Sequence, residues 1–269
     1  MAEAPLTTVN QNQRLAAKEK NMRTLIMLFV ALMLCISSSA YAKKPSKNAN
    51  KPIATCAPSI PSAQKIKAED FALLKSKAEQ GNAGNQWSLG YRHEGGFDVA
   101  QDYAKAAEWY KLAAVQGDAS AQANLGLLYD NGRGLAQDYF EAVKWYQLAA
   151  AQGYALAQNN LGFMYENGRG IAQDYAEAAK WYQLAAAQGY ALAQFNLGLA
   201  YQLGKGVAHD DVNAHMWFNL SASKGRIDAA ALRDGLASKM TADQISRAQK
   251  LATECATRTF KDCSDLAKN

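Results

Sequence analysis

Residues 117–152 read GDASAQANLGLLYDNGRGLAQDYFEAVKWYQLAAAQ, and residues 153–188 read GYALAQNNLGFMYENGRGIAQDYAEAAKWYQLAAAQ, so two adjacent 36-residue segments are near-copies. The spacing extends to both sides, because a glycine opens each unit, a Leu-Gly pair follows it, and a Trp followed by Tyr or Phe lies near the end. The four units cover residues 81–116, 117–152, 153–188 and 189–224. A fixed period of this length is typical of a solenoid, in which each unit buries its apolar face by stacking on its neighbours.

Each unit has the pattern of two helices separated by a glycine-rich loop. In the second unit, residues 119–129 predict the first helix, and residues 131–134 (NGRG) end it, because glycine adopts the positive φ that closes a helix. Asp138 then caps a second helix that ends near Gln152, and Glu141 gives the spacing of a capping box. Proline is absent beyond residue 61, which favours continuous helices.

The array continues at both ends in incomplete form. Residues 68–80 predict a single helix of the second type, which would form a half-repeat cap before the first unit. Residues 225–256 predict a C-terminal cap of two helices, the first over 227–239. The first unit departs from the pattern, since His93 replaces a tyrosine and Asp98 replaces the second loop glycine. We therefore expect its loop to have a different shape.

The repeated residues point to a known family. In the second unit they are Ala121, Leu125, Gly126, Tyr129, Gly132, Gly134, Asp138, Ala142, Trp145, Tyr146, Ala149, Ala150 and Gly153. This set resembles the Sel-one-like repeat family, a relative of the tetratricopeptide repeats. The resemblance implies an all-α fold over residues 63–256: a right-handed α/α superhelix of four helix–loop–helix repeats plus capping helices. It also implies a scaffold that docks other proteins, and exported bacterial relatives include envelope adaptors and proteins that contact host proteins.

Residues 1–42 have the pattern of a signal peptide. The apolar run LIMLFVALMLCI (25–36) follows several basic residues, and a small-residue A-x-A motif ends at Ala42. We expect cleavage after Ala42 and a true translation start at Met22. The mature protein is then periplasmic or secreted, with no integral membrane span. Residues 43–62 predict a disordered linker rich in lysine and proline.

The charge balance argues against nucleic acid as a partner. The whole chain has a formal net charge of +5, and removal of residues 1–42 leaves three more basic than acidic residues. The helical part is close to neutral, because the lysines that account for this excess are Lys43, Lys44, Lys47 and Lys51. Nucleic-acid binding requires a basic stripe, so we expect none.

Three cysteines remain after the expected cleavage: Cys56, Cys255 and Cys263. An exported protein meets an oxidising compartment, in which cysteines pair. The favoured pair is Cys255 with Cys263, because these residues are close in sequence and their bond would hold the tail of residues 257–269. A pair between Cys56 and either of the others, which would join the two ends of the array, stays open.

The sequence offers little catalytic chemistry. The only histidines are His93, His209 and His215, no His/Cys spacing suits a metal, and no Gly-rich phosphate loop follows a strand. We therefore expect no enzyme activity, catalytic residue, metal or cofactor. Ser221 and Lys224 match the S-x-x-K motif of serine β-lactamases, but the partner motifs are absent. A hydrolase of the cell envelope, including a β-lactamase-like activity, is the alternative function.

Two sets of repeated positions predict different roles. The aromatic pairs, from Trp109-Tyr110 to Trp217-Phe218, recur beside alanines, so they predict packing between units. The remaining face of each first helix differs among the units and is expected to line a concave groove that binds an extended peptide or a helix of a partner protein. The predicted partner-binding residues are Tyr91, Asn124, Leu127, Leu156, Asn160, Phe163, Leu192, Asn196 and Leu199.

The asparagines of this set have two interpretations. Asn124, Asn160 and Asn196 recur every 36 residues, so their amides could clamp the backbone of a bound peptide. They could equally bond a neighbouring helix or loop of the same chain. We favour the second interpretation.

Overall fold

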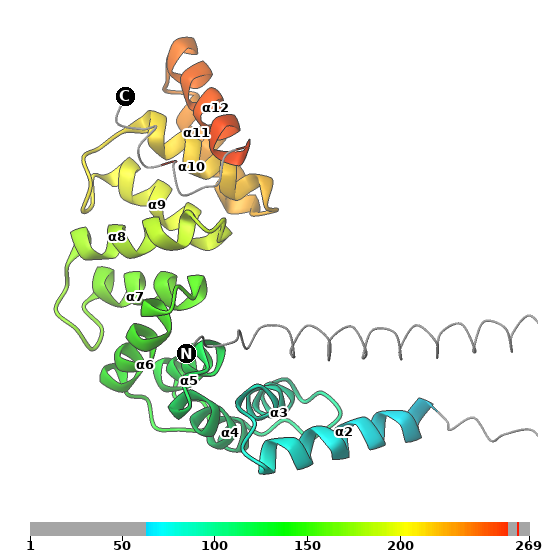
Figure 1. Cartoon of the computed structure of the whole chain (residues 1–269). Coiled ribbons are helices and arrows are strands. Elements are labelled where there is room, and N and C mark those ends of the chain that lie inside the picture. Colours follow the sequence, from blue (N-terminus) through cyan, green and yellow to red (C-terminus); the bar gives the residue numbers. More distant parts are fainter. Residues whose placement is uncertain (1–62, 258–262, 264–269) are drawn as a thin grey trace, which may run out of the picture. The chain divides into compact units, whose positions relative to one another are not determined.

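The computed structural model describes residues 63–257 and Cys263, and within that part the chain forms helices and no strand (Figure 1). The predicted signal peptide and linker (1–62) and most of the tail lie outside the described residues. No described helix is long and apolar enough to cross a membrane. The helices are α2 (Ala63–Glu79), α3 (Ala83–Gly95), α4 (Tyr103–Val115), α5 (Ala119–Asn131), α6 (Tyr139–Ala151), α7 (Ala155–Asn167), α8 (Tyr175–Ala186), α9 (Ala191–Leu203), α10 (Asp211–Ser223), α11 (Ile227–Ala237) and α12 (Ala242–Thr257).

The helices pack in the order of the chain (Figure 1). We call α3, α5, α7 and α9 the A helices, because they are the first helices of the four units, and α4, α6, α8 and α10 the B helices. Each helix packs against the next from α2 to α11, and α12 packs against α10. The predicted all-α solenoid of four helix–loop–helix repeats with capping helices is therefore confirmed.

The helix boundaries differ in detail from the prediction. Helix α2 begins at Ala63, five residues earlier than predicted, because residues 63–67 contain good helix formers and no glycine or proline. The Asp138 carboxylate caps α6 by accepting the N–H groups of Phe140 and Glu141 at 2.9 and 3.1 Å. The Glu141 carboxylate accepts from Lys144 Nζ at 2.5 Å. For Glu141, the bond observed is therefore this one rather than the reciprocal bond of a capping box.

The first unit corrects the expectation of a differently shaped loop. Asp98 has a φ of 62°, close to the 71° of Gly134 and the 67° of Gly170. Aspartate tolerates this left-handed conformation better than most residues. The Asp98 carboxylate also forms an ion pair with Arg92. The backbone conformation is therefore kept, although the glycine is not.

The loop between the two helices of a unit packs on the preceding unit. A Cβ atom added at Gly170 would lie 2.3 Å from the carbonyl oxygen of Tyr139, at the start of the B helix one unit earlier. The Arg169 guanidinium lies over the Tyr139 ring at 5.5 Å from its centroid. Gly134 and Gly206 approach Tyr103 and Tyr175 in the same way. The second loop glycine is therefore needed for its size as well as for its φ.

A row of glutamines, buried on the A helices and exposed at the ends of the B helices, links the units. We call it the amide ladder: Gln86, Gln122 and Gln158 on the A helices, and Gln116, Gln152 and Gln188 at the ends of the B helices. Each A-helix amide donates to a carbonyl at the end of the preceding B helix, as Gln158 Nε2 does to Ala150 at 3.2 Å. It also accepts from the second glutamine of its own unit, as Gln158 Oε1 does from Gln188 at 2.7 Å. One side chain thus joins three helices.

The aromatic pairs occupy two environments. Tyr110, Tyr146 and Tyr182 are buried, as are both members of the last pair, Trp217 and Phe218. In the first three pairs the tryptophan is half-buried. Trp145 and Trp181 lie against buried clusters that their own unit shares with a neighbour. Most of the aromatic surface is therefore used for packing.

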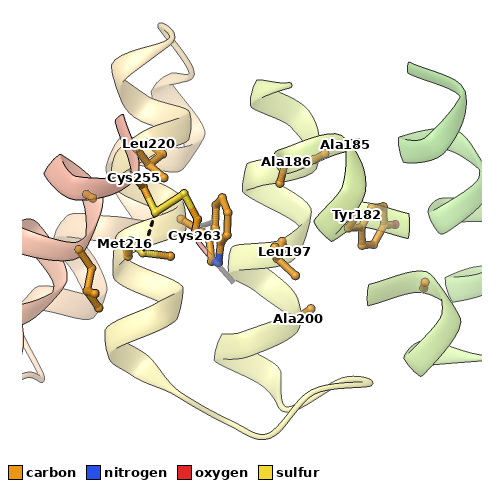
Figure 2. Close-up of a cluster of buried hydrophobic side chains, with 14 residues drawn as sticks. Tyr182, Ala185, Ala186, Leu197, Ala200, Met216, Leu220, Cys255 and Cys263 are labelled. Carbon is orange, nitrogen blue, oxygen red and sulfur yellow. Dashed lines mark hydrogen bonds between the residues drawn. A yellow bond between two sulfur atoms is a disulfide. The ribbon is translucent and has the colours of Figure 1, made fainter. Parts of the chain in front are cut away.

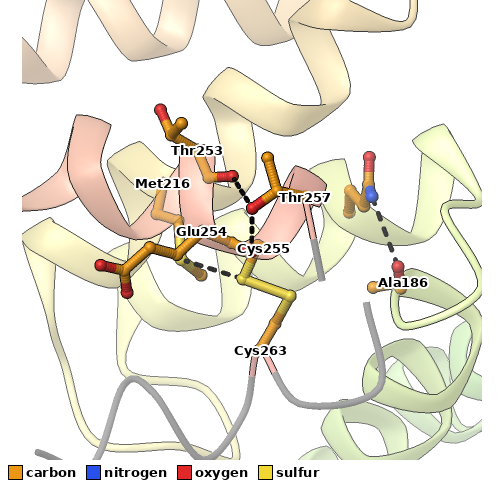
Figure 3. The surroundings of a disulfide bond; sticks show 8 residues. Ala186, Met216, Thr253, Glu254, Cys255, Thr257 and Cys263 are labelled. Atoms are coloured by element: carbon orange, nitrogen blue, oxygen red, sulfur yellow. Dashed lines mark hydrogen bonds between the residues drawn. A yellow bond between two sulfur atoms is a disulfide. The ribbon is translucent and has the colours of Figure 1, made fainter. Parts of the chain in front are cut away.

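The C-terminal cap closes the array with α11 and α12. Figure 2 shows Met216 and Leu220 of α10 beside Cys255 of α12, in the same cluster as Tyr182 and Leu197. Cys255 and Cys263 are bonded, with Cα atoms 5.2 Å apart, a separation within the normal range for disulfides (Figure 3). Their oxidation in the protein stays a prediction. Cys56 lies outside the described residues.

Candidate binding surface

Four predicted residues occupy the same place on successive A helices. We call Tyr91, Leu127, Phe163 and Leu199 the A-helix row. Tyr91 is 47% exposed and Phe163 is 36% exposed, whereas Leu127 and Leu199 are half-buried. Neighbouring A helices are linked directly, since Asn196 Nδ2 of α9 donates to Asn159 Oδ1 of α7 at 3.0 Å. The repeat therefore presents an apolar or aromatic side chain at regular intervals.

Aromatic side chains surround the first member of the row. The Tyr91 ring is stacked on Trp87 with centroids 5.8 Å apart, and it lies 5.4 Å from the ring of Phe97. Phe97 is itself 49% exposed. At the third position, the Arg169 guanidinium lies 5.1 Å from the centroid of Phe163. The row thus combines aromatic faces with a cation.

The predicted leucines expose less surface than Tyr91 and Phe163. Leu156 is half-buried against the cluster around Tyr146, and Leu199 against the cluster around Phe218. Leu192 is half-buried near the start of α9. A partner that contacts these residues reaches only part of each side chain.

The asparagines bond to neighbouring side chains. Asn124 Nδ2 donates to the Tyr110 hydroxyl at 2.9 Å and lies 3.4 Å from Glu94 Oε2. Asn160 Oδ1 accepts from Asn159 at 3.2 Å, and Asn196 also bonds to Asn159. These contacts match the interpretation in which the amides bond within the chain. A role in partner binding stays a prediction.

Beside the asparagines lies a set of tyrosine–carboxylate pairs that the sequence pattern did not predict. The Tyr110 hydroxyl donates to Glu94 at 2.6 Å, and the Tyr182 hydroxyl donates to Glu166 at 2.7 Å. Burial, with the carboxylate beside it, raises the pKa of both phenols well above the usual value, so they stay protonated and donate. The spacing of 16 residues within a unit is a signal that the sequence did contain.

The second unit breaks this pattern. Asp130 stands where the other pairs have glutamate, and it is one methylene shorter. Asp130 Oδ1 is buried with no hydrogen-bond partner, and the buried Tyr146 hydroxyl lacks a carboxylate partner and has only the Asn160 side chain beside it. Burial raises the pKa of Asp130, and the charge of Arg169 partly opposes this. A buried polar atom without a partner destabilises the fold by about 1–3 kcal/mol.

Replacing Asp130 with glutamate is expected to stabilise the protein. The longer side chain should reach Tyr146 as Glu94 and Glu166 reach their tyrosines, which adds about 1 kcal/mol to the free energy of unfolding. Urea denaturation followed by circular dichroism measures the change. The reverse substitution, Glu166→Asp, is the control and should destabilise by a similar amount. An Asp130→Glu variant no more stable than the parent would contradict the assignment.

The residues considered for catalysis lie on different elements or already form a hydrogen bond within the chain. Ser221 is buried, and its hydroxyl donates to the carbonyl of Ala191 at 2.7 Å. His93 lies on α3, His209 precedes α10 at the surface, and His215 is buried in α10, where burial lowers its pKa. Within residues 63–257 and at Cys263, no group of three His, Cys, Asp or Glu side chains could hold a metal ion.

Comparisons with known proteins agree with the repeat. The Sel1 repeat model matches residues 86–118, 119–154, 155–190 and 191–225, about half of the chain. A Sel1 repeat protein from Oxalobacter formigenes is 36% identical, with a TM-score of 0.56 over 63% of this chain and 72% of that one. A protective antigen present in uropathogenic Escherichia coli strains, which displays an SLR fold, is 31% identical with a TM-score of 0.49. That match covers 73% of this chain and 50% of the antigen, and no curated protein matches by sequence. With four matched repeats in register with the helix pairs, the chain belongs to the Sel1 repeat family.

Proposed function

We propose that this protein is an exported, non-enzymatic adaptor that binds a segment of a partner protein along its A-helix row. Sel1 repeat folds commonly mediate protein–protein interaction. The observation that carries the proposal is the partly exposed row Tyr91–Leu127–Phe163–Leu199. Exposed aromatic residues on a rigid scaffold are the side chains that most often dominate binding energies.

The row suits an extended segment or a helix. Its apolar side chains recur once per unit, so a bound segment would place its own apolar residues at matching intervals. The polar network beside the row links neighbouring A helices through bonds such as Asn196 to Asn159. A surface that is already ordered binds with a smaller loss of entropy.

The Phe163→Ala variant tests the row. Loss of an exposed aromatic anchor is expected to weaken binding at least about tenfold, which corresponds to about 1.4 kcal/mol. The partner is first identified with a photoreactive amino acid placed at residue 163 in the native cell envelope. Its affinity is then measured by titration calorimetry.

Phe140→Ala is the matched control. Phe140 is 70% exposed, more than Phe163, but it lies on the B helix α6. This variant should bind within about twofold of the parent. If both phenylalanines prove equally important, or neither does, the A-helix row is not the binding surface.

Export rests on the residues that precede the helices. An apolar run of twelve residues with basic residues before it and an A-x-A motif after it is read by the secretion machinery. Mass spectrometry of the non-reduced native protein should give a chain that begins at Lys43. The same spectrum should lack two hydrogens from the Cys255–Cys263 pair. A mature chain that retains residues 22–42 would contradict export with cleavage of a signal peptide.

A further inference from the structure

The first unit contains a cavity of about 530 Å³ away from the A-helix row. Its lining residues come from α2, from α3 with the loop that follows it, and from α4. Its apolar lining consists of Phe71, Leu89, Val99, Trp109 and Leu112. Small-molecule sites typically have volumes of about 300–1,000 Å³ and a mainly apolar lining with a few polar groups.

The equivalent groove in the second unit is smaller. There the volume is about 230 Å³, and Tyr129 occupies the place of His93. Tyr129 packs against the buried clusters of that region. The difference therefore arises where the first unit departs from the repeat, at His93.

Helix α2 adds a second departure. In the next groove the corresponding wall is formed by α4, whose buried face carries Ala106, Ala107 and Ala113. Asp70, Phe71 and Lys77 stand at those places on α2. Phe71 therefore lines the cavity together with Trp109, at the place where the next groove has Ala107.

The polar groups of the lining favour an anion. His93 Nδ1 is buried with no hydrogen-bond partner of good geometry, although the Ala100 backbone lies beside the imidazole, and this nitrogen can donate to or accept from a ligand. Lys75 pairs with Glu79 at 3.8 Å and Lys105 with Asp102 at 3.4 Å. Both lysines are more than half exposed, and such pairs contribute less than about 1 kcal/mol, so each ammonium group can leave its carboxylate for a ligand at little cost. Glu108 is the single carboxylate of the lining.

We propose that this cavity binds a small organic acid with an aromatic body. The ring fills the space lined by Phe71 and Trp109, where aromatic faces attract one another. The carboxylate meets the lysine ammonium groups, and His93 supplies a hydrogen bond. The site is independent of the A-helix row and can be present whether or not that row binds a partner.

The probe is naphthalene-2-carboxylate, titrated into the full chain by calorimetry. We expect saturable binding of one molecule per chain. Naphthalen-2-ylmethanol has the same body without the charge and should bind at least about tenfold more weakly. Failure of the acid to saturate a single site, or equal binding of the alcohol, overturns the proposal.

His93→Tyr restores the residue of the repeat and separates binding from folding. The phenol ring should fill part of the cavity, so affinity for the probe falls at least about tenfold while the thermal midpoint stays the same or rises. Unchanged affinity in this variant overturns the proposal.

Leu112→Glu and Leu148→Glu form a matched pair. The two leucines occupy the same place in successive units and are 47% and 50% exposed, but Leu112 alone lines the cavity. A glutamate at residue 112 repels a bound carboxylate, so affinity should fall about tenfold, whereas Leu148→Glu should leave it unchanged. Equal effects of the two substitutions count against the site.

Discussion

Replacing Gly170 with alanine is expected to lower the free energy of unfolding by more than about 3 kcal/mol. The added Cβ atom would lie 2.3 Å from the carbonyl oxygen of Tyr139, which is backbone and cannot turn away. The residue also has a φ of 67°, which alanine adopts at a cost of about 1–2 kcal/mol. Urea denaturation followed by circular dichroism at 222 nm measures the loss.

Gly153→Ala separates the two causes. Gly153 has a φ of 84°, but a Cβ atom added there meets nothing within 4 Å. Only the conformational cost then applies, so the loss should be about 1–2 kcal/mol. Equal losses in the two variants would mean that close packing of the loop on the preceding unit contributes nothing.

The second large effect is expected at Gln158. Alanine at this position removes the bonds to the Ala150 carbonyl and the Gln188 amide and creates a small cavity, because Gln158 is only 5% exposed. We expect a loss of about 3 kcal/mol in the free energy of unfolding. Gln147→Ala, at an exposed position of α6, is the control and should change stability by less than about 0.5 kcal/mol.

A double-mutant cycle tests the bond itself. Gln188→Ala removes the donor, so the double variant Gln158→Ala/Gln188→Ala should lose less than the sum of the single variants. Additive losses would show that the two amides do not act together in the amide ladder.

The repeat made most of the fold predictable. A Leu-Gly pair and a Trp-Tyr pair at a fixed period locate the two helices of a unit, because the same apolar positions must meet at every interface. The loop glycines mark the helix ends, since few other residues adopt a positive φ. Pro61 marks the start of the helical domain at Ala63, but the apolar periodicity begins only at Ala68, so the first five residues of α2 were not predicted as helix.

Side-chain partners were harder to predict. Gln158 and Gln188 recur in register, but a sequence does not show that the two amides meet across a unit. The Asn124 amide could have faced a peptide or a tyrosine with the same spacing. The loop around Asp98 keeps the backbone conformation of the other units, because aspartate can adopt the positive φ of the glycine that it replaces. The loss of one glycine therefore did not predict a change of shape. The cavity beside His93 arises where several residues differ from the repeat pattern, and its volume depends on all of them together.

The packing of each loop on the unit before it has a direction. Gly134, Gly170 and Gly206 all approach a B helix nearer the N-terminus. A growing chain leaves the ribosome N-terminus first, and N-terminal parts generally fold first. The same order holds for a chain that leaves a secretion channel N-terminus first, so each loop meets a support that has emerged before it and folding can advance unit by unit. Removal of units from the C-terminal end would leave every remaining loop packed on its B helix. Removal of the first unit would take away the B helix on which the loop of the second unit packs.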